Sequence, residues 1–172
     1  GLNPDVMVKI AQTESGLNPS AANPKSSARG VYQFIAPTWK QYGQGDPLDP
    51  MANIDAGMRF TRDNQAGLRN GIGRDPTAGE LYLAHQQGLG GALAMLKNPS
   101  APVGGDAITL NGGQNGMTGA DFAAKWSAKI DGTAAPATGG SQIAQMGVPG
   151  AVYGSREPGF DMSPLAETMQ KM

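Results

Sequence analysis

Glu14 is the residue of this 172-residue chain whose surroundings best suit chemistry. Val6, Ile10 and Glu14 recur every fourth residue, so a helix would place the carboxyl at the end of an apolar stripe. A partly dry environment favours the neutral form of a carboxyl, which suits a general acid working near neutral pH. The stripe alone is equally compatible with a glutamate that ends a helix and points into solvent.

Composition excludes several other chemistries. The chain has no cysteine and one histidine, which rules out a disulfide scaffold, a cysteine nucleophile and a thiolate or histidine-rich metal site. We therefore expect no metal and no cofactor. Its 13 basic and 14 acidic residues nearly balance, so nucleic-acid binding through bulk charge is not expected. No apolar run approaches the roughly 20 residues of a membrane span.

Helix start and stop signals predict an all-α domain over residues 1–130. Asn3-Pro4 begins and Gly16 ends a first helix, Thr77 with Glu80 forms a capping box, and Thr118 with Asp121 can cap the last helix. Further helices are expected over 37–43, from 49 to about 68, and over 92–97 after a break at 88–91. The side chains expected to face inward are Ile54, Met58, Thr61, Leu68, Leu81, Ala84, His85, Phe122, Trp126 and Ile130. Only residues 107–110 show an alternating, strand-like pattern.

Residues 131–172 differ in character, with seven glycines and four prolines among 42 residues. Such a segment cannot bury enough apolar surface to offset its own ordering entropy. It is expected to be an extended arm with a short terminal helix from Ser163-Pro164. Both a disordered tail and an arm that becomes ordered on a partner fit this composition.

Four segments in order resemble the soluble lytic transglycosylase-like (SLT) family. They are Glu14-Ser15-Gly16, then Gly30-Val31-Tyr32-Gln33 with Pro37-Thr38-Trp39, then Asp49-Pro50 with Asn53-Ile54 and Gly57, and finally Ala84-His85-Gln86-Gln87-Gly88. The resemblance covers roughly residues 1–98 and implies a lysozyme-like fold. It also implies cleavage of the β-1,4 bond between N-acetylmuramic acid (MurNAc) and N-acetylglucosamine (GlcNAc) in peptidoglycan, with formation of a 1,6-anhydroMurNAc end.

The resemblance implies that Glu14 is the catalytic acid and base, and that substrate acetamido and hydroxyl groups replace a second carboxylate. Substrate-binding or orienting roles carry over to Ser15 and Gln33, and Tyr32 is expected in the wall of the cleft. His85 and Gln86 stand where the family usually has tyrosine and asparagine. His85 can still donate a hydrogen bond to the Glu14 carboxyl, and Gln86 keeps an amide for the sugar. Ser15, Gln33 and His85 could each instead be structural residues, and Trp39 is expected in the core.

The leading hypothesis is a virion-borne enzyme of a bacteriophage that opens the cell wall during genome entry. No signal peptide is visible, and residues 131–172 are expected to bind other tail or ejection proteins. The expected location is therefore the phage particle, acting in the host periplasm, or the bacterial periplasm if a leader was removed. The alternatives are a structural virion or secretion component with an inactive glycan-binding domain, and a hydrolytic muramidase on the same fold.

Overall fold

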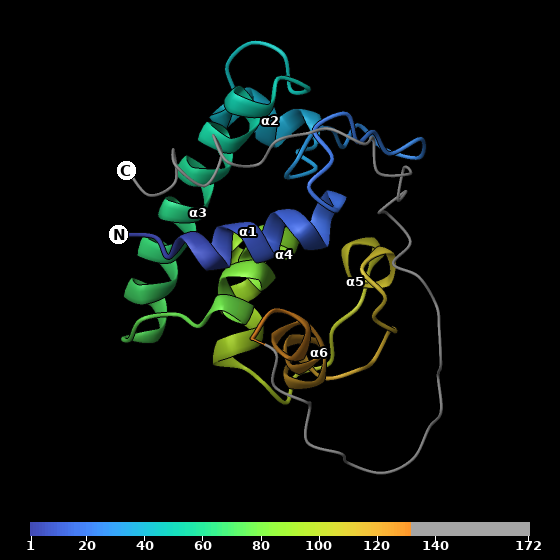
Figure 1. Cartoon of the computed structure of the whole chain (residues 1–172). Helices are drawn as coiled ribbons and strands as arrows, with labels where there is room; N and C mark the ends of the chain where they lie inside the picture. The colour runs from blue at the N-terminus through green and yellow to red at the C-terminus, as the bar shows by residue number, and fades with distance from the viewer. Residues whose placement is uncertain (132–172) are drawn as a thin grey trace. The chain divides into compact units, whose positions relative to one another are not determined.

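The computed structural model describes residues 1–131, so the expected arm lies outside the described residues except for Asp131. The described part falls into two compact units, an N-terminal unit of residues 1–60 and a C-terminal unit of residues 61–131. The helices, labelled in Figure 1, are α1 (Pro4–Ser15), α2 (Ala36–Tyr42), α3 (Pro50–Ile72), α4 (Ala78–Lys97), α5 (Asp106–Leu110) and α6 (Gly119–Asp131). Within residues 1–131 β pairing is limited to isolated bridges, so the predicted all-α class is confirmed. The expected domain bounds of 1–130 remain a prediction.

Helix α1 begins and ends where its sequence signals predict. The side chain of Asn3 accepts a hydrogen bond from the Asp5 N–H at 2.9 Å, and Pro4 occupies the first turn. Gly16 ends the helix in the left-handed conformation, and its N–H donates to the Gln12 carbonyl. The buried face of α1 consists of Met7, Ile10, Ala11 and Ser15.

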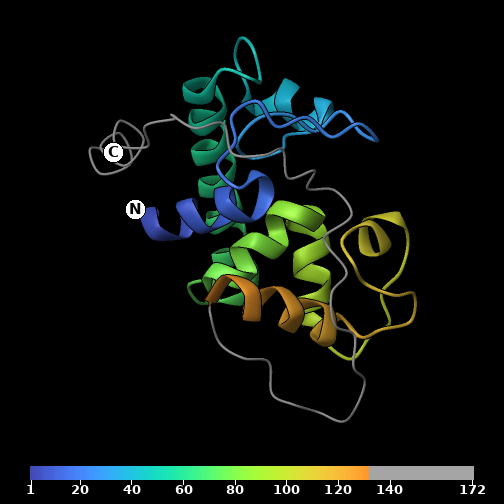
Figure 2. The ribbon, with the colours of Figure 1, turned by 45° about the vertical axis from the view of Figure 1, so that its right-hand side comes forward.

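An aromatic cluster joins α2 to the first half of α3, and the two helices lie side by side in Figures 1 and 2. The Phe34 ring lies 5.9 Å from Trp39 and 5.8 Å from Phe60, and Phe60 in turn lies 5.1 Å from Tyr42. Aromatic pairs at these separations add to the stabilisation from burial alone. Trp39 is half-buried in this cluster, and its indole N–H donates to the Gly45 carbonyl.

The C-terminal unit is built on α4, with α6 running alongside it (Figure 2). Tyr82 of α4 meets Trp126 of α6 edge to face at 5.3 Å, and Phe122 and Ile130 complete the buried face of α6. All the residues expected to face inward are buried except His85, which is half-buried. The predicted break in α4 occurs at Gly88, whose φ of 70° and ψ of 162° are non-helical. Helical geometry resumes at once, so the separate helix expected over 92–97 is the second half of α4.

Helix α5 was not expected, because its residues carried the strand-like alternation. A helix of five residues is too short to display a 3.6-residue period or to be stable alone. Its stability comes from tertiary packing: Ile108 is 3% exposed, and the Asn115 side chain accepts a hydrogen bond from the Gly105 N–H that precedes the helix.

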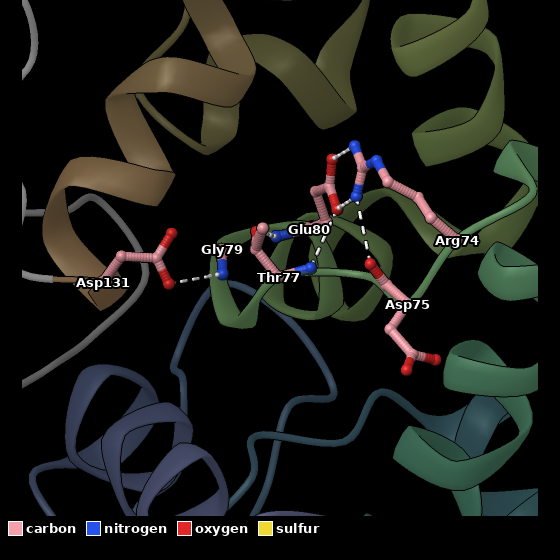
Figure 3. Close-up of polar contacts among 6 residues, drawn as sticks. All are labelled: Arg74, Asp75, Thr77, Gly79, Glu80 and Asp131. Carbon is pink, nitrogen blue, oxygen red and sulfur yellow. Dashed lines mark hydrogen bonds and ion pairs between the residues drawn. The ribbon is translucent and has the colours of Figure 1, made fainter.

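The start of α4 is held by several side-chain hydrogen bonds (Figure 3). Thr77 and Glu80 form both hydrogen bonds of the predicted capping box, at 3.2 and 2.8 Å. Arg74 donates to both carboxylate oxygens of Glu80, and the Gly79 N–H donates to Asp131 at the end of α6. These contacts connect the start of α4 to the residues just before it and to the end of α6, all within the C-terminal unit. No helix in residues 1–131 has the length and apolar character to cross a membrane.

Candidate active site

Glu14 lies in the last turn of α1 and is half-buried. The backbone immediately after it is unusual, because Gly16 and Leu17 both have positive φ, at 64° and 67°. Within residues 1–131 only Leu17 and Gln33 combine a side chain with a positive φ. Such conformations are costly for L-residues and cluster at functional sites, because the surrounding structure must enforce them. Leu17 directly follows the predicted segment Glu14-Ser15-Gly16, and Gln33 ends the predicted segment 30–33.

Ser15 is buried, and its hydroxyl is engaged inside the N-terminal unit. The Oγ lies 2.8 Å from the Val31 carbonyl oxygen and 3.2 Å from that of Ala11. A hydroxyl has one proton to donate, and the shorter distance favours Val31. The bond connects the end of α1 to the turn that contains Val31, sixteen residues further along the chain. Ser15 therefore anchors the residue next to Glu14, and the roles predicted for it in orienting the site or binding the substrate stay predictions.

Gln33 is half-buried and bridges two backbone carbonyls. Its Nε2 donates to Gly30 at 2.8 Å and to Ala21 at 3.1 Å, while its own φ is 49°. The side-chain amide thereby stabilises the turn from Gly30 to Phe34 by hydrogen bonding to its backbone. This use of the amide nitrogen leaves the side-chain oxygen as the group with which Gln33 could contact a substrate.

Tyr32 is not in a cleft wall, which corrects the expectation. None of its surface is exposed, and its hydroxyl donates to the Met7 carbonyl of α1 at 3.1 Å. A Cβ placed on Gly57 would lie 2.7 Å from the ring, so the glycine of α3 makes room for it. Burial raises the pKa of the Tyr32 phenol, which stays neutral. The tyrosine supports α1 from within the core and does not face a sugar.

His85 and Gln86 lie on α4 in the C-terminal unit, where both contact Tyr82. The rings of His85 and Tyr82 stack with centroids 6.1 Å apart and an interplanar angle of 15°. Gln86 donates from Nε2 to the Tyr82 hydroxyl at 3.0 Å, and its Oε1 is buried without a hydrogen-bond partner in the described part of the chain. Tyr82 thus contacts both His85 and Gln86, the two residues that differ from the usual family pattern. The hydrogen bond expected between His85 and Glu14 remains a prediction.

Four other carboxylates of the chain have structural partners. Asp46 and Asp49 accept backbone hydrogen bonds from Leu48 and Ala52, at 2.9 and 2.8 Å, in the turn before α3 and at its start. Asp55 pairs with Arg59 one turn along α3. Glu80 pairs with Arg74, and this hydrogen bond holds the pKa of Glu80 below its ordinary value. Each of these four acids thus has a structural partner of its own.

From the sequence, Asn53 had no expected role beyond its place in the family pattern. In the structure it is a fully buried amide of the N-terminal unit. The sequence carried one signal for it, a polar residue beside Ile54 on the inward side of an amphipathic helix. Two of its three partners, Tyr32 and Arg29, could not be predicted, because they lie more than twenty residues away along the chain.

Comparison with protein families agrees with this arrangement. The model of the transglycosylase SLT domain matches residues 1–101, which include Glu14 and all the other predicted site residues. The chain belongs to the transglycosylase SLT-domain family, whose members are lytic transglycosylases acting on peptidoglycan. The lysozyme-like fold implied by the sequence resemblance is thereby confirmed.

Proposed function

We propose that Glu14 performs both proton transfers of a peptidoglycan lytic transglycosylase. The neutral carboxyl protonates the O4 atom of the leaving GlcNAc as the bond from C1 of MurNAc to that oxygen breaks. The resulting carboxylate then takes the proton of the MurNAc C6 hydroxyl as O6 bonds to C1 and closes the 1,6-anhydro ring. No water is consumed, and Glu14 returns to its neutral form.

The observation that carries this proposal is the anchoring of the turn that holds Glu14. Glu14 is half-buried, whereas the next residue is buried and hydrogen-bonded to Val31. Efficient proton transfer requires a donor held within hydrogen-bond reach of the reacting oxygen. A carboxyl on an anchored helix end meets that requirement better than one on a freely moving side chain at a frayed terminus.

The experiment is product analysis of digested peptidoglycan in water labelled with oxygen-18. We expect anhydro-ended fragments without the label. Labelled reducing ends would identify a hydrolytic muramidase, and intact glycan that still binds the protein would identify an inactive binding domain. The variant Glu14→Gln keeps the side-chain volume and should lower the rate by about 10²–10⁴-fold, the usual contribution of general acid–base catalysis. Gln12→Ala, at an exposed position of α1 two residues before Glu14, is the control and should stay active.

We further propose that the enzyme is carried in a phage particle and opens the host wall locally during genome entry. The support is compositional: the Gly/Pro-rich residues 131–172 suit an arm that binds other tail or ejection proteins. Deleting residues 132–172 should leave activity on purified wall nearly intact and prevent incorporation into the particle. Loss of activity on purified wall, or normal incorporation of the truncated chain, would contradict the docking role.

A further inference from the structure

Two buried side chains hold the same peptide group from opposite ends. The N–H of Tyr32 donates to Oδ1 of Asn53 at 2.8 Å, and the carbonyl of Val31 accepts from the Ser15 hydroxyl, also at 2.8 Å. These N–H and C=O groups belong to the single peptide bond between residues 31 and 32. The bond is trans, so its two polar groups point in opposite directions. Asn53 of α3 and Ser15 of α1 are thus connected through one rigid plane.

Asn53 is itself held firmly. Its Nδ2 donates to the Pro47 carbonyl at 2.8 Å and to the Arg29 carbonyl at 3.3 Å, so three of its four hydrogen-bonding positions are used within the core. None of its surface is exposed. Gly30 passes so close that an added Cβ would lie 2.3 Å from Nδ2, and its φ is 75°. The backbone of residues 29–32 therefore packs closely against the Asn53 side chain and is hydrogen-bonded to it.

We infer that Asn53 is a positioning residue for catalysis and acts on Glu14 through the peptide group 31–32 and Ser15. Asn53 sets the height and tilt of that peptide plane, the plane fixes the Ser15 hydroxyl, and Ser15 fixes the last turn of α1. Hydrogen bonds linked through a peptide group polarise one another, which strengthens both ends of the chain of contacts. This inference rests on the proposed role of Glu14.

The same amide also shapes the turn that carries Gln33. Gly30 contributes a carbonyl to the Gln33 side chain, and Arg29 pairs with Phe34 through two backbone hydrogen bonds. Asn53 contacts the backbone on the N-terminal side of this turn. Asn53 is buried, contacts the backbone of the segment 30–33 and is linked to Ser15 through the peptide group 31–32. Its substitution can therefore affect the chemical step while leaving substrate contacts in place.

The test compares Asn53→Leu and Asn53→Asp with the wild type. Leucine is similar in size but removes every hydrogen bond of the amide. Aspartate keeps an acceptor for the Tyr32 N–H but faces the Pro47 and Arg29 carbonyls with oxygen. Ile130→Ala, which empties a fully buried position of the C-terminal unit, is the control for lost stability. All proteins are assayed on soluble peptidoglycan oligomers well below their unfolding temperatures, with folding checked by circular dichroism.

We expect Asn53→Leu to lower kcat by about 10- to 100-fold with KM nearly unchanged, because small displacements of a catalytic group have costs of this size. Asn53→Asp should lose less, and Ile130→Ala should keep the wild-type kcat despite a lower Tm. Hydrogen exchange, read without substrate, should show the Tyr32 amide unprotected in Asn53→Leu and protected in Asn53→Asp.

A wild-type kcat in folded Asn53→Leu, or an equal loss in Ile130→Ala, would overturn the inference. So would a Tyr32 amide that stays protected in Asn53→Leu. If Asn53→Leu does not fold, Asn53→Asp carries the test, and a wild-type kcat in that variant would overturn the inference. Because the exchange measurement needs no turnover, it is independent of the proposed function, which fails separately if Glu14→Gln remains active.

Discussion

Arg74 donates to both carboxylate oxygens of Glu80, at 2.6 and 2.8 Å, while Glu80 also accepts the Thr77 N–H that begins α4. One carboxylate thus serves an ion pair and a helix cap together (Figure 3). The arginine is largely exposed and the glutamate buried, so the contribution to stability comes mainly from satisfying the buried carboxylate.

This arrangement predicts a specific pH dependence of stability. The hydrogen bond from Arg74, aided by that of Thr77, lowers the pKa of Glu80 from 4.5 although partial burial opposes the shift. The folded state therefore binds the proton more weakly than the unfolded state does. The stabilisation is complete above the unfolded pKa and is lost as the pH falls through the lower, folded pKa. Urea unfolding of the wild type should show this loss below pH 4.5.

Glu80→Gln provides the comparison for that measurement. The variant should unfold more easily than the wild type at neutral pH, and the difference should shrink as the pH falls below 4.5. Parallel stability curves for the two proteins across this range would show that Glu80 is not the titrating group.

Ser15→Ala should reduce both stability and activity. Removing the hydroxyl leaves the buried Val31 carbonyl without its side-chain donor, at a cost of about 1–3 kcal/mol. The end of α1 is then less firmly held, and kcat should fall more than KM rises. Thr13→Ala, which removes a hydroxyl from the same helical turn, is the control for hydroxyl loss. Equal effects of the two substitutions on kcat would argue against an orienting role for Ser15.

The positive φ of Gln33 predicts an unusual order of stability. Gln33→Gly and Gln33→Ala both remove the side-chain bonds to Gly30 and Ala21, but only glycine adopts a φ of 49° without strain. The glycine variant should therefore be more stable than the alanine variant by about 1 kcal/mol, against the usual preference for alanine. Chemical denaturation measures the difference, and a more stable alanine variant would mean that the turn relaxes.

His85 can be tested with three substitutions that separate ring packing from hydrogen bonding. Tyrosine keeps a ring against Tyr82 and a hydroxyl donor, phenylalanine keeps the ring alone, and alanine keeps neither. If His85 donates a hydrogen bond to Glu14, the tyrosine variant should retain most activity while the other two lose much of it. Full activity in the phenylalanine variant would limit His85 to a packing role.

Local sequence signals were sufficient for most of the helical framework. The Asn3 cap, the Gly16 stop, the Thr77 capping box and the Gly88 break depend on atoms within four residues of one another, so their residue types identify them directly. The catalytic role of Glu14 was predicted in the same way, from a helical stripe and its neighbouring family motif, and it stays a prediction. Helix α5 was missed because its stability comes from tertiary packing, not from its own five residues.

The roles of the residues around Glu14 were decided by tertiary structure. Ser15 finds its acceptor sixteen residues away and Asn53 finds its donor twenty-one residues away. Tyr32, expected in a cleft wall, instead reaches under α1 to Met7. The type of a side chain determines which hydrogen bonds it can donate or accept. Its actual partner, when the group is buried, is whichever donor or acceptor the fold brings within reach. The sequence therefore predicted which residue carries the acid, and only the packing of α1, α3 and the segment between them decided which groups hold the end of α1 in place.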